Sequence, residues 1–141
     1  FEHLEMNHGW NQFVVNVKNY TSINTNLNDQ LYLNKIHNDI GLLDSSPRDL
    51  LKYDLEQLGV KTIIYYPIPI HLQPAYENHG FLIGSFPNTE NACSQVLSLP
   101  IFPEITLTQQ NYVIESIKKL CLQSKAQELT GSVPSSNTLS I

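Results

Sequence analysis

We expect the chain to be organised around the segment VKTIIYYPIPIHLQPAY (residues 60–76), in which an apolar, β-branched run leads into two tyrosines and is then interrupted by prolines. The run from Val60 to Tyr66 predicts a buried strand. Pro67 and Pro69 end that strand, since proline has no N–H for a ladder and has a fixed φ. We expect the following turn to place His71 on a short loop or helical turn among other polar groups. A ligand site is therefore predicted at the end of this strand.

Three helices are predicted around this strand. The first begins at Ser46, where Asp49 three residues later completes a capping box, and it ends at Gly59, which supplies a left-handed residue. The second covers residues 88–96. The third begins at TLTQ (residues 106–109), another capping box, and carries an apolar stripe along one side.

Two further strands are predicted at residues 13–17 and 97–99. The first shows little alternation between apolar and polar residues, which suits a sheet that is covered on both faces. The predicted fold is α+β: a small, mostly antiparallel sheet of about three strands flanked by helices. It occupies residues 1–123, with an Asn-rich insert at 18–44 that contains a short amphipathic helix. We expect residues 124–141 to be a disordered polar tail, because they are too poor in apolar residues to pack.

Length and composition limit the possible classes of protein. The 141 residues support one domain. The net charge of -5 at pH 7 argues against a nucleic-acid-binding surface, which needs clustered Lys and Arg. No apolar run approaches the roughly 20 residues of a membrane helix, and no signal pattern follows Phe1. We therefore expect a cytoplasmic protein with no membrane contact.

The two cysteines, Cys93 and Cys121, are far apart, and each lies in an apolar helical pattern. They offer neither a metal-binding pair nor a redox Cys-x-x-Cys motif. Free cysteine behaves as a small apolar residue, so we expect two buried, reduced thiols. The sequence predicts no metal site.

Four segments resemble, in the same order, the C-terminal region of the DegT/StrS-type sugar aminotransferases. HGWNQFVV (residues 8–15) resembles a family strand with the pattern His-x-Tyr-His-Gln-Tyr-Val, and YPIPIHLQPAY (residues 66–76) resembles a later motif. Residues 86–100 resemble the family's penultimate helix and strand, and residues 103–113 resemble its last helix. The resemblance implies the small C-terminal domain of a fold-type I aminotransferase. Such enzymes use pyridoxal phosphate to aminate keto sugars carried on nucleoside diphosphates.

The resemblance also implies substrate contacts at the end of the predicted strand. Tyr66 matches the tyrosine of a family His-Tyr pair that approaches the sugar nucleotide, Tyr65 replaces the histidine, and His71 matches a Pro-x-His motif. The residues by themselves leave other roles open. Adjacent strand residues point to opposite faces, so one tyrosine ring is expected in the core. His71 is equally typical of an exposed loop histidine that bonds a backbone carbonyl.

The resemblance implies that the cofactor is held elsewhere. Transamination with pyridoxal phosphate needs a lysine for the Schiff base, an acidic partner for the pyridinium nitrogen and a phosphate cup. The family's lysine follows a Ser-Phe-x-x-x-Lys pattern in the large domain, and this chain has no such pattern. We expect no catalytic or cofactor-binding residue here, and no activity of this chain alone. Its lysines are Lys18, Lys35, Lys52, Lys61, Lys118, Lys119 and Lys125.

The complete enzyme implied by the resemblance is a cytoplasmic homodimer. It takes an amino group from a donor such as glutamate and serves amino-sugar or surface-polysaccharide biosynthesis. The sequence leaves open an alternative from another class, a non-catalytic module of the same descent that binds a sugar nucleotide or has only a structural role. A coding frame that continues upstream through a Ser-Phe-x-x-x-Lys segment would favour the enzyme.

Overall fold

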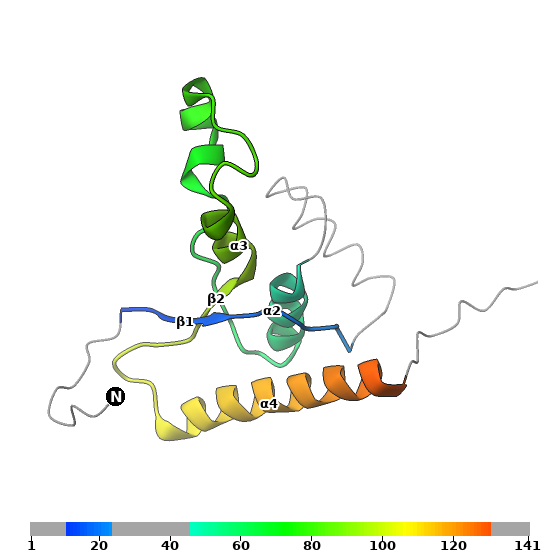
Figure 1. Ribbon diagram of the computed structural model, residues 1–141. Helices are drawn as coiled ribbons and strands as arrows, with labels where there is room; N and C mark the ends of the chain where they lie inside the picture. Colours follow the sequence, from blue (N-terminus) through cyan, green and yellow to red (C-terminus); the bar gives the residue numbers. More distant parts are fainter. Residues whose placement is uncertain (1–10, 24–45, 131–141) are drawn as a thin grey trace, which may run out of the picture.

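The computed structural model describes residues 11–23 and 46–130 (Figure 1). The helix expected in the Asn-rich insert, the start of the first family motif and residues 131–141 lie outside this part. The elements in chain order are β1 (Phe13–Asn16), α2 (Pro47–Gln57), the 3₁₀ helices η1 (Ile70–Leu72) and η2 (Pro74–His79), α3 (Pro87–Gln95), β2 (Val96–Leu99) and α4 (Leu107–Thr130). This mixture of helices with a small antiparallel sheet confirms the predicted α+β class.

The sheet of the described residues has two antiparallel strands, β1 and β2. Both lie where the sequence predicts strands. In their register, Val15 pairs with Leu97 and Val14 pairs with Ser98. Paired residues share a face of a sheet, so Val15 and Leu97 lie on one face, and Val14 and Ser98 lie on the other.

The segment from Val60 to Tyr66 does not form the third strand that its β-branched run predicts. It makes a single bridge, in which Ile63 and Ser98 exchange backbone hydrogen bonds of 2.8 and 3.1 Å. Pairing does not extend toward α2, because the Val60 N–H donates to Leu55 O at the end of that helix. In the other direction, pairing stops at the Ile63 bridge. It cannot resume after Tyr66, because the prolines that follow have no N–H. The sheet therefore has two strands and one bridge rather than about three strands.

Within residues 11–23 and 46–130, one face of the sheet is covered and the other is not. Leu97 is fully buried on the covered face, and Val15 packs against the core there. Val14 and Ile63 on the other face are 45% and 51% exposed. The expectation of a sheet covered on both faces is therefore wrong for β1 as far as the described residues show, because Val14 on this face is exposed. The buried core consists of Val17, Tyr20, Leu51, Leu55, Val60, Leu97 and Leu120.

Local capping signals set the ends of the helices. Ser46 N donates to Asp49 Oδ2 at 3.2 Å and Asp49 N donates to Ser46 Oγ at 3.3 Å, which confirms the predicted capping box of α2. Gly59 follows α2 with a φ of 76°, a left-handed conformation that glycine adopts without steric cost. At the start of α4, Gln109 N donates to Thr106 Oγ1 at 3.2 Å, which confirms the second box.

α4 is longer than the sequence predicts, since it continues to Thr130. The expectation of a disordered tail beginning at Ser124 is therefore wrong for residues 124–130. Ser124 is buried, and its Oγ accepts a hydrogen bond of 2.8 Å from the Thr21 N–H. A partner 103 positions earlier in the chain thus holds this polar part of the helix.

Both cysteines are free. Cys93 is half-buried and Cys121 is exposed, so the expectation of a buried thiol is wrong for Cys121. Its neighbour Leu120 lies on the buried side of α4 instead, with Ser116 one turn before it and Ser124 one turn after it. Partial desolvation raises the pKa of both thiols.

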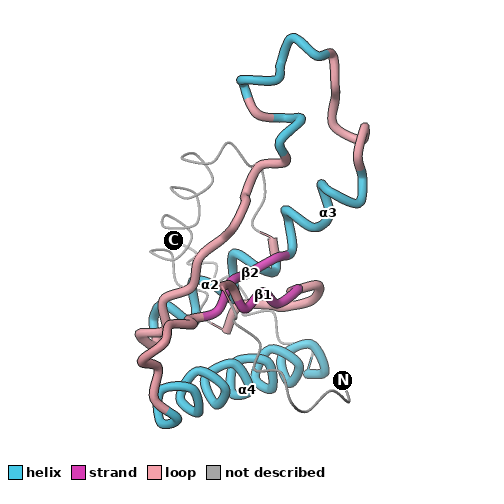
Figure 2. Tube along the Cα trace, turned by 90° about the vertical axis from the view of Figure 1, so that its left-hand side faces the viewer, coloured by secondary structure: helices cyan, strands magenta, loops and turns pink. Residues whose placement is uncertain are grey.

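Residues 67–95 project from the sheet and from α4 as an arm, which is visible in two perpendicular views (Figures 1 and 2). The arm contains η1, η2 and α3, and no residue of η2 or α3 is buried. The position of α3 confirms the helix predicted at residues 88–96. The two tyrosines lie where the arm leaves the sheet, so the predicted site adjoins both parts.

Candidate functional site

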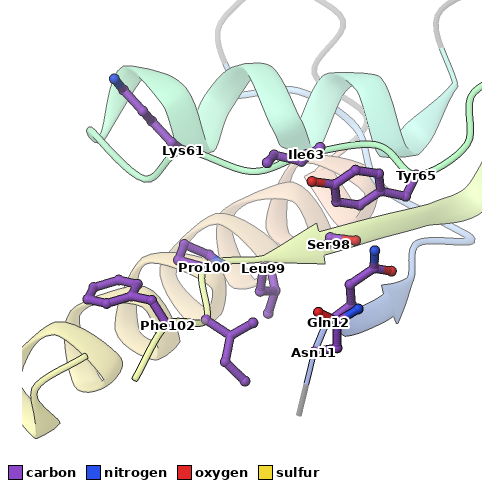
Figure 3. A pocket seen from close by; sticks show the side chains of 10 residues that line it. Asn11, Gln12, Lys61, Ile63, Tyr65, Ser98, Leu99, Pro100 and Phe102 are labelled. Atoms are coloured by element: carbon purple, nitrogen blue, oxygen red, sulfur yellow. The ribbon is translucent and has the colours of Figure 1, made fainter. Parts of the chain in front are cut away.

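A cavity of about 250 Å³ opens on the uncovered face of the sheet (Figure 3). We call it the sheet-face cavity. Three separate segments supply its polar side chains: the residues before β1, the segment after α2, and β2. These side chains are Asn11, Gln12, Lys61, Tyr65 and Ser98. Its apolar lining includes Ile63, Leu99 and Phe102.

Tyr65 lines the sheet-face cavity, whereas Tyr66 lies outside its lining. The two phenol rings contact each other edge-on, with centroids 6.2 Å apart. Tyr65 is 40% and Tyr66 67% exposed. The expectation that one ring faces the core is therefore wrong. A strand would have alternated the two side chains, but the ladder ends at the Ile63 bridge and does not reach them.

His71 is buried inside the arm, not exposed on a loop. Its Nε2 lies 3.0 Å from Glu90 Oε1, and its ring packs against Phe86 with centroids 4.8 Å apart. The interpretation as an exposed histidine bonded to a backbone carbonyl is therefore wrong. The η1 turn directs the ring toward α3, so His71 and the two tyrosines do not converge on one cavity.

Glu90 joins the parts of the arm. Its carboxylate accepts hydrogen bonds from Gly84 N at 2.8 and 3.0 Å and from Phe86 N at 3.1 Å, in addition to its contact with His71. These bonds, above all those from Gly84, hold the pKa of Glu90 below its usual value. Glu90 was not among the site residues predicted from the sequence. The sequence does carry a signal for its role: Glu90 is an acidic residue in the first turn of the helix that begins after Phe86, at Pro87.

Arg48 anchors the base of the arm. This role was not predicted from the sequence either. It is fully buried, and its Nε lies 2.8 Å from Asp49 Oδ1. Its Nη1 donates to Cys93 O at 2.8 Å, in the last turn of α3. No sequence motif announces this role, because a charged residue in the first turn of α2 is typical of a solvated surface.

The described residues offer no metal site, and the sheet-face cavity does not fit a complete site for pyridoxal phosphate. No three of their His, Cys, Asp or Glu side chains gather in a way that could hold a metal ion. Lys61 lines the sheet-face cavity, but no carboxylate lines it with Lys61 to pair with a pyridinium nitrogen.

Within residues 11–23 and 46–130, none of the helices has the length and apolar character that crossing a membrane requires.

Comparison with known proteins identifies the family. The model of the DegT/DnrJ/EryC1/StrS aminotransferase family matches residues 6–118. The chain is 46% identical over 70 residues to a "pleiotropic regulatory protein" of Geobacillus stearothermophilus. It is 40% identical over 72 residues to dTDP-3-amino-3,4,6-trideoxy-alpha-D-glucose transaminase of Streptomyces venezuelae. These matches cover 50% and 51% of this chain but 19% of each relative, so the chain spans a small part of their length.

A solved structure agrees with the sequence relatives. The crystal structure of S. venezuelae DesV in complex with a ketimine intermediate superposes with a TM-score of 0.51 and 39% sequence identity. The similarity covers 52% of this chain and 20% of that chain. The α+β architecture, the order of the motifs and the family match over residues 6–118 agree with one another. This chain belongs to the DegT/DnrJ/EryC1/StrS aminotransferase family.

Proposed function

We propose that the chain is the C-terminal part of a pyridoxal-phosphate-dependent aminotransferase that acts on a nucleotide-linked keto sugar. The observation that carries the proposal is the family match over residues 6–118. It is supported by a relative whose name describes a transaminase of a dTDP-linked amino sugar. Residues 1–123, together with the rest of α4 to Thr130, form the small domain of that enzyme. The complete protein is a cytoplasmic homodimer that uses glutamate as amino donor and serves amino-sugar or surface-polysaccharide biosynthesis.

In this proposal Tyr66, Tyr65 and His71 supply the substrate-side contacts. The exposed phenols of Tyr65 and Tyr66 lie at and beside the sheet-face cavity, so a sugar nucleotide can reach both. A phenol donates a hydrogen bond to a sugar hydroxyl or a phosphate oxygen. A contact from His71 would have to use its Nδ1, because its Nε2 lies 3.0 Å from Glu90 Oε1.

The cofactor is held by residues outside this chain. Bound pyridoxal phosphate supplies an electron sink for moving the amino group. The sheet-face cavity offers polar contacts to a substrate but lacks the paired lysine and carboxylate that the cofactor needs. The chain therefore contributes recognition of the substrate rather than its chemistry.

A transamination assay tests the proposal. The complete coding frame is expressed, loaded with pyridoxal phosphate and mixed with dTDP-3-amino-3,4,6-trideoxy-α-D-glucose and 2-oxoglutarate. Formation of glutamate is the expected result, and the present chain by itself should form none. If the complete protein binds the sugar nucleotide tightly but forms no glutamate and shows no spectral change with either amino donor, the non-catalytic binding module replaces the enzyme.

A further inference from the structure

Ser98 lies on the uncovered face of the sheet, between Val14 of β1 and Ile63 of the bridge. These two neighbours are about half exposed, whereas Ser98 itself is 6% exposed. Its Oγ is buried and has no hydrogen-bond partner among the described residues. A buried hydroxyl without a partner destabilises a fold. Packing alone therefore does not explain a serine at this position.

Ser98 is one of the residues that line the sheet-face cavity. Figure 3 shows it between the Tyr65 ring and the Gln12 side chain, with Asn11 next to Gln12. A serine hydroxyl, a phenol and two carboxamides from three chain segments thus border one volume of about 250 Å³. Each of these groups can both donate and accept a hydrogen bond. The set matches a ligand that carries several hydroxyl groups.

The described lining of the cavity is nearly free of charge. It contains no carboxylate, and its one cation, Lys61, is exposed and directs its amino group away from the other labelled side chains (Figure 3). Phosphate groups are typically bound by arginine forks or helix N-termini, and neither lines this cavity. The volume is also below the roughly 300–1,000 Å³ of pockets for drug-sized ligands. An uncharged ring therefore suits this lining better than a phosphate-bearing group does.

We propose that Ser98 and Gln12 bind hydroxyl groups of an uncharged hexose ring in the sheet-face cavity. Ile63 and Phe102 supply an apolar surface for the C–H groups of such a ring. The identity of the biological ligand rests on the proposed function, in which the ring is the sugar of the nucleotide-linked substrate. Ser98 and Gln12 then set the specificity for that sugar, beside the contact from Tyr65.

Titration of the full chain with methyl α-D-glucopyranoside, followed by protein NMR, tests the inference. Ser98→Ala should weaken binding about 3- to 10-fold, the effect of losing one neutral hydrogen bond. The melting temperature of the unliganded variant should stay the same or rise, because an unpaired buried hydroxyl is removed. Gln12→Leu, at an exposed position, should weaken binding to a similar extent.

Thr62→Val is the matched control. Thr62 is also 6% exposed with a buried hydroxyl that has no partner among the described residues, but it is not among the residues that line the cavity. This variant should bind the glycoside like the unaltered chain. An absence of glycoside-dependent shifts, unchanged affinity in Ser98→Ala, or an equal loss in Thr62→Val overturns the inference.

The probe separates this inference from the proposed function. Methyl α-D-glucopyranoside carries no nucleotide and no amino group, so its binding does not depend on transamination. A failed transamination assay with a positive, Ser98-dependent titration refutes the proposed function alone. If transamination by the complete protein succeeds but the glycoside binds nowhere near Ser98, this inference alone is refuted.

Discussion

Arg48 and Asp49 form an ion pair, with 2.8 Å between Nε and Oδ1, in which both side chains are removed from solvent. Asp49 also caps α2, and Arg48 donates to Cys93 O in the last turn of α3. Consecutive residues thus connect the start of one helix to the end of another. The signs of the charges suit both ends, because a helix N-terminus favours an anion and a C-terminus favours a cation.

Replacement of Arg48 by Met should destabilise the chain by about 3–5 kcal/mol, because it leaves the Asp49 carboxylate buried without its partner. The free energy of unfolding is measured by urea titration. Lys52→Met is the control, since Lys52 and Glu56 are partly exposed and 3.7 Å apart, and such a pair contributes about 0–1 kcal/mol. Equal losses in the two variants would show that the buried pair does not hold α2 to α3.

The carboxylate of Glu90 makes the fold of the arm depend on pH. Because the hydrogen bonds from Gly84 and Phe86 lower the pKa of Glu90, its stabilising contribution is complete above the usual glutamate pKa of about 4.3. That contribution is lost as the pH falls through the lowered pKa of the folded state. Hydrogen exchange of the Gly84 amide should therefore lose protection at acidic pH.

Two variants check this assignment. Glu90→Gln should reduce protection of the Gly84 amide at neutral pH and remove its acid transition. Glu77→Gln, at an exposed carboxylate in η2, should keep both. Retention of the acid transition in Glu90→Gln contradicts the assignment.

Tyr20→Phe should destabilise the chain by about 1.5–3 kcal/mol, the contribution of a hydrogen bond to a charged group. The Tyr20 hydroxyl donates to Asp54 Oδ2 at 2.5 Å in the buried core, and burial together with this carboxylate raises the pKa of Tyr20 above its usual range. Tyr112→Phe is the control, because its exposed hydroxyl donates to Leu58 O and should contribute about 0.5–1.5 kcal/mol. Chemical denaturation measures the free energy of unfolding of both variants. A larger loss of stability in Tyr112→Phe than in Tyr20→Phe would contradict the argument.

Tyr66→Phe in the complete enzyme should raise KM for the sugar nucleotide about 3- to 10-fold, because one neutral hydrogen bond is lost. The melting temperature should not change, since Tyr66 is largely exposed. The half-reaction with the amino donor, which does not involve the nucleotide, should be unaffected. A lower melting temperature with a normal KM would assign Tyr66 a structural role.

The chain by itself should form no Schiff base with pyridoxal phosphate. Lys61 lines the cavity without a neighbouring carboxylate, and Lys118 is paired with Glu115 at 2.9 Å on the surface of α4. Borohydride reduction followed by peptide mass spectrometry detects any adduct. A stoichiometric, borohydride-stable adduct on one lysine would place the cofactor site within this chain.

Much of the local structure could be predicted because its causes lie within a few residues. The capping box of Ser46 and Asp49, the left-handed Gly59 and the box that starts α4 each depend on groups no more than four positions apart. The same holds for the apolar run of β2. The family could also be recognised, because its motifs are themselves short and ordered segments.

The errors share a different cause, which is contact between distant parts of the chain. Ser124 stays helical because Thr21 donates to its side chain, and His71 is buried because Glu90 lies beside it in the folded arm. The tyrosines are both exposed because the ladder with Ser98 stops at Ile63. None of these partners can be inferred from the spacing within one segment.

The α+β class, the ends of the helices and the family could be predicted from the sequence, because periodicity, capping and motif order are encoded in neighbouring residues. Which face of the sheet is uncovered, and which polar groups border its cavity, depends on the folded arrangement of distant segments. Asn11, Tyr65 and Ser98 are brought together by strand register and by the turn at Gly59. Register depends on which segments pair, and a slip of one residue would turn every side chain to the other face.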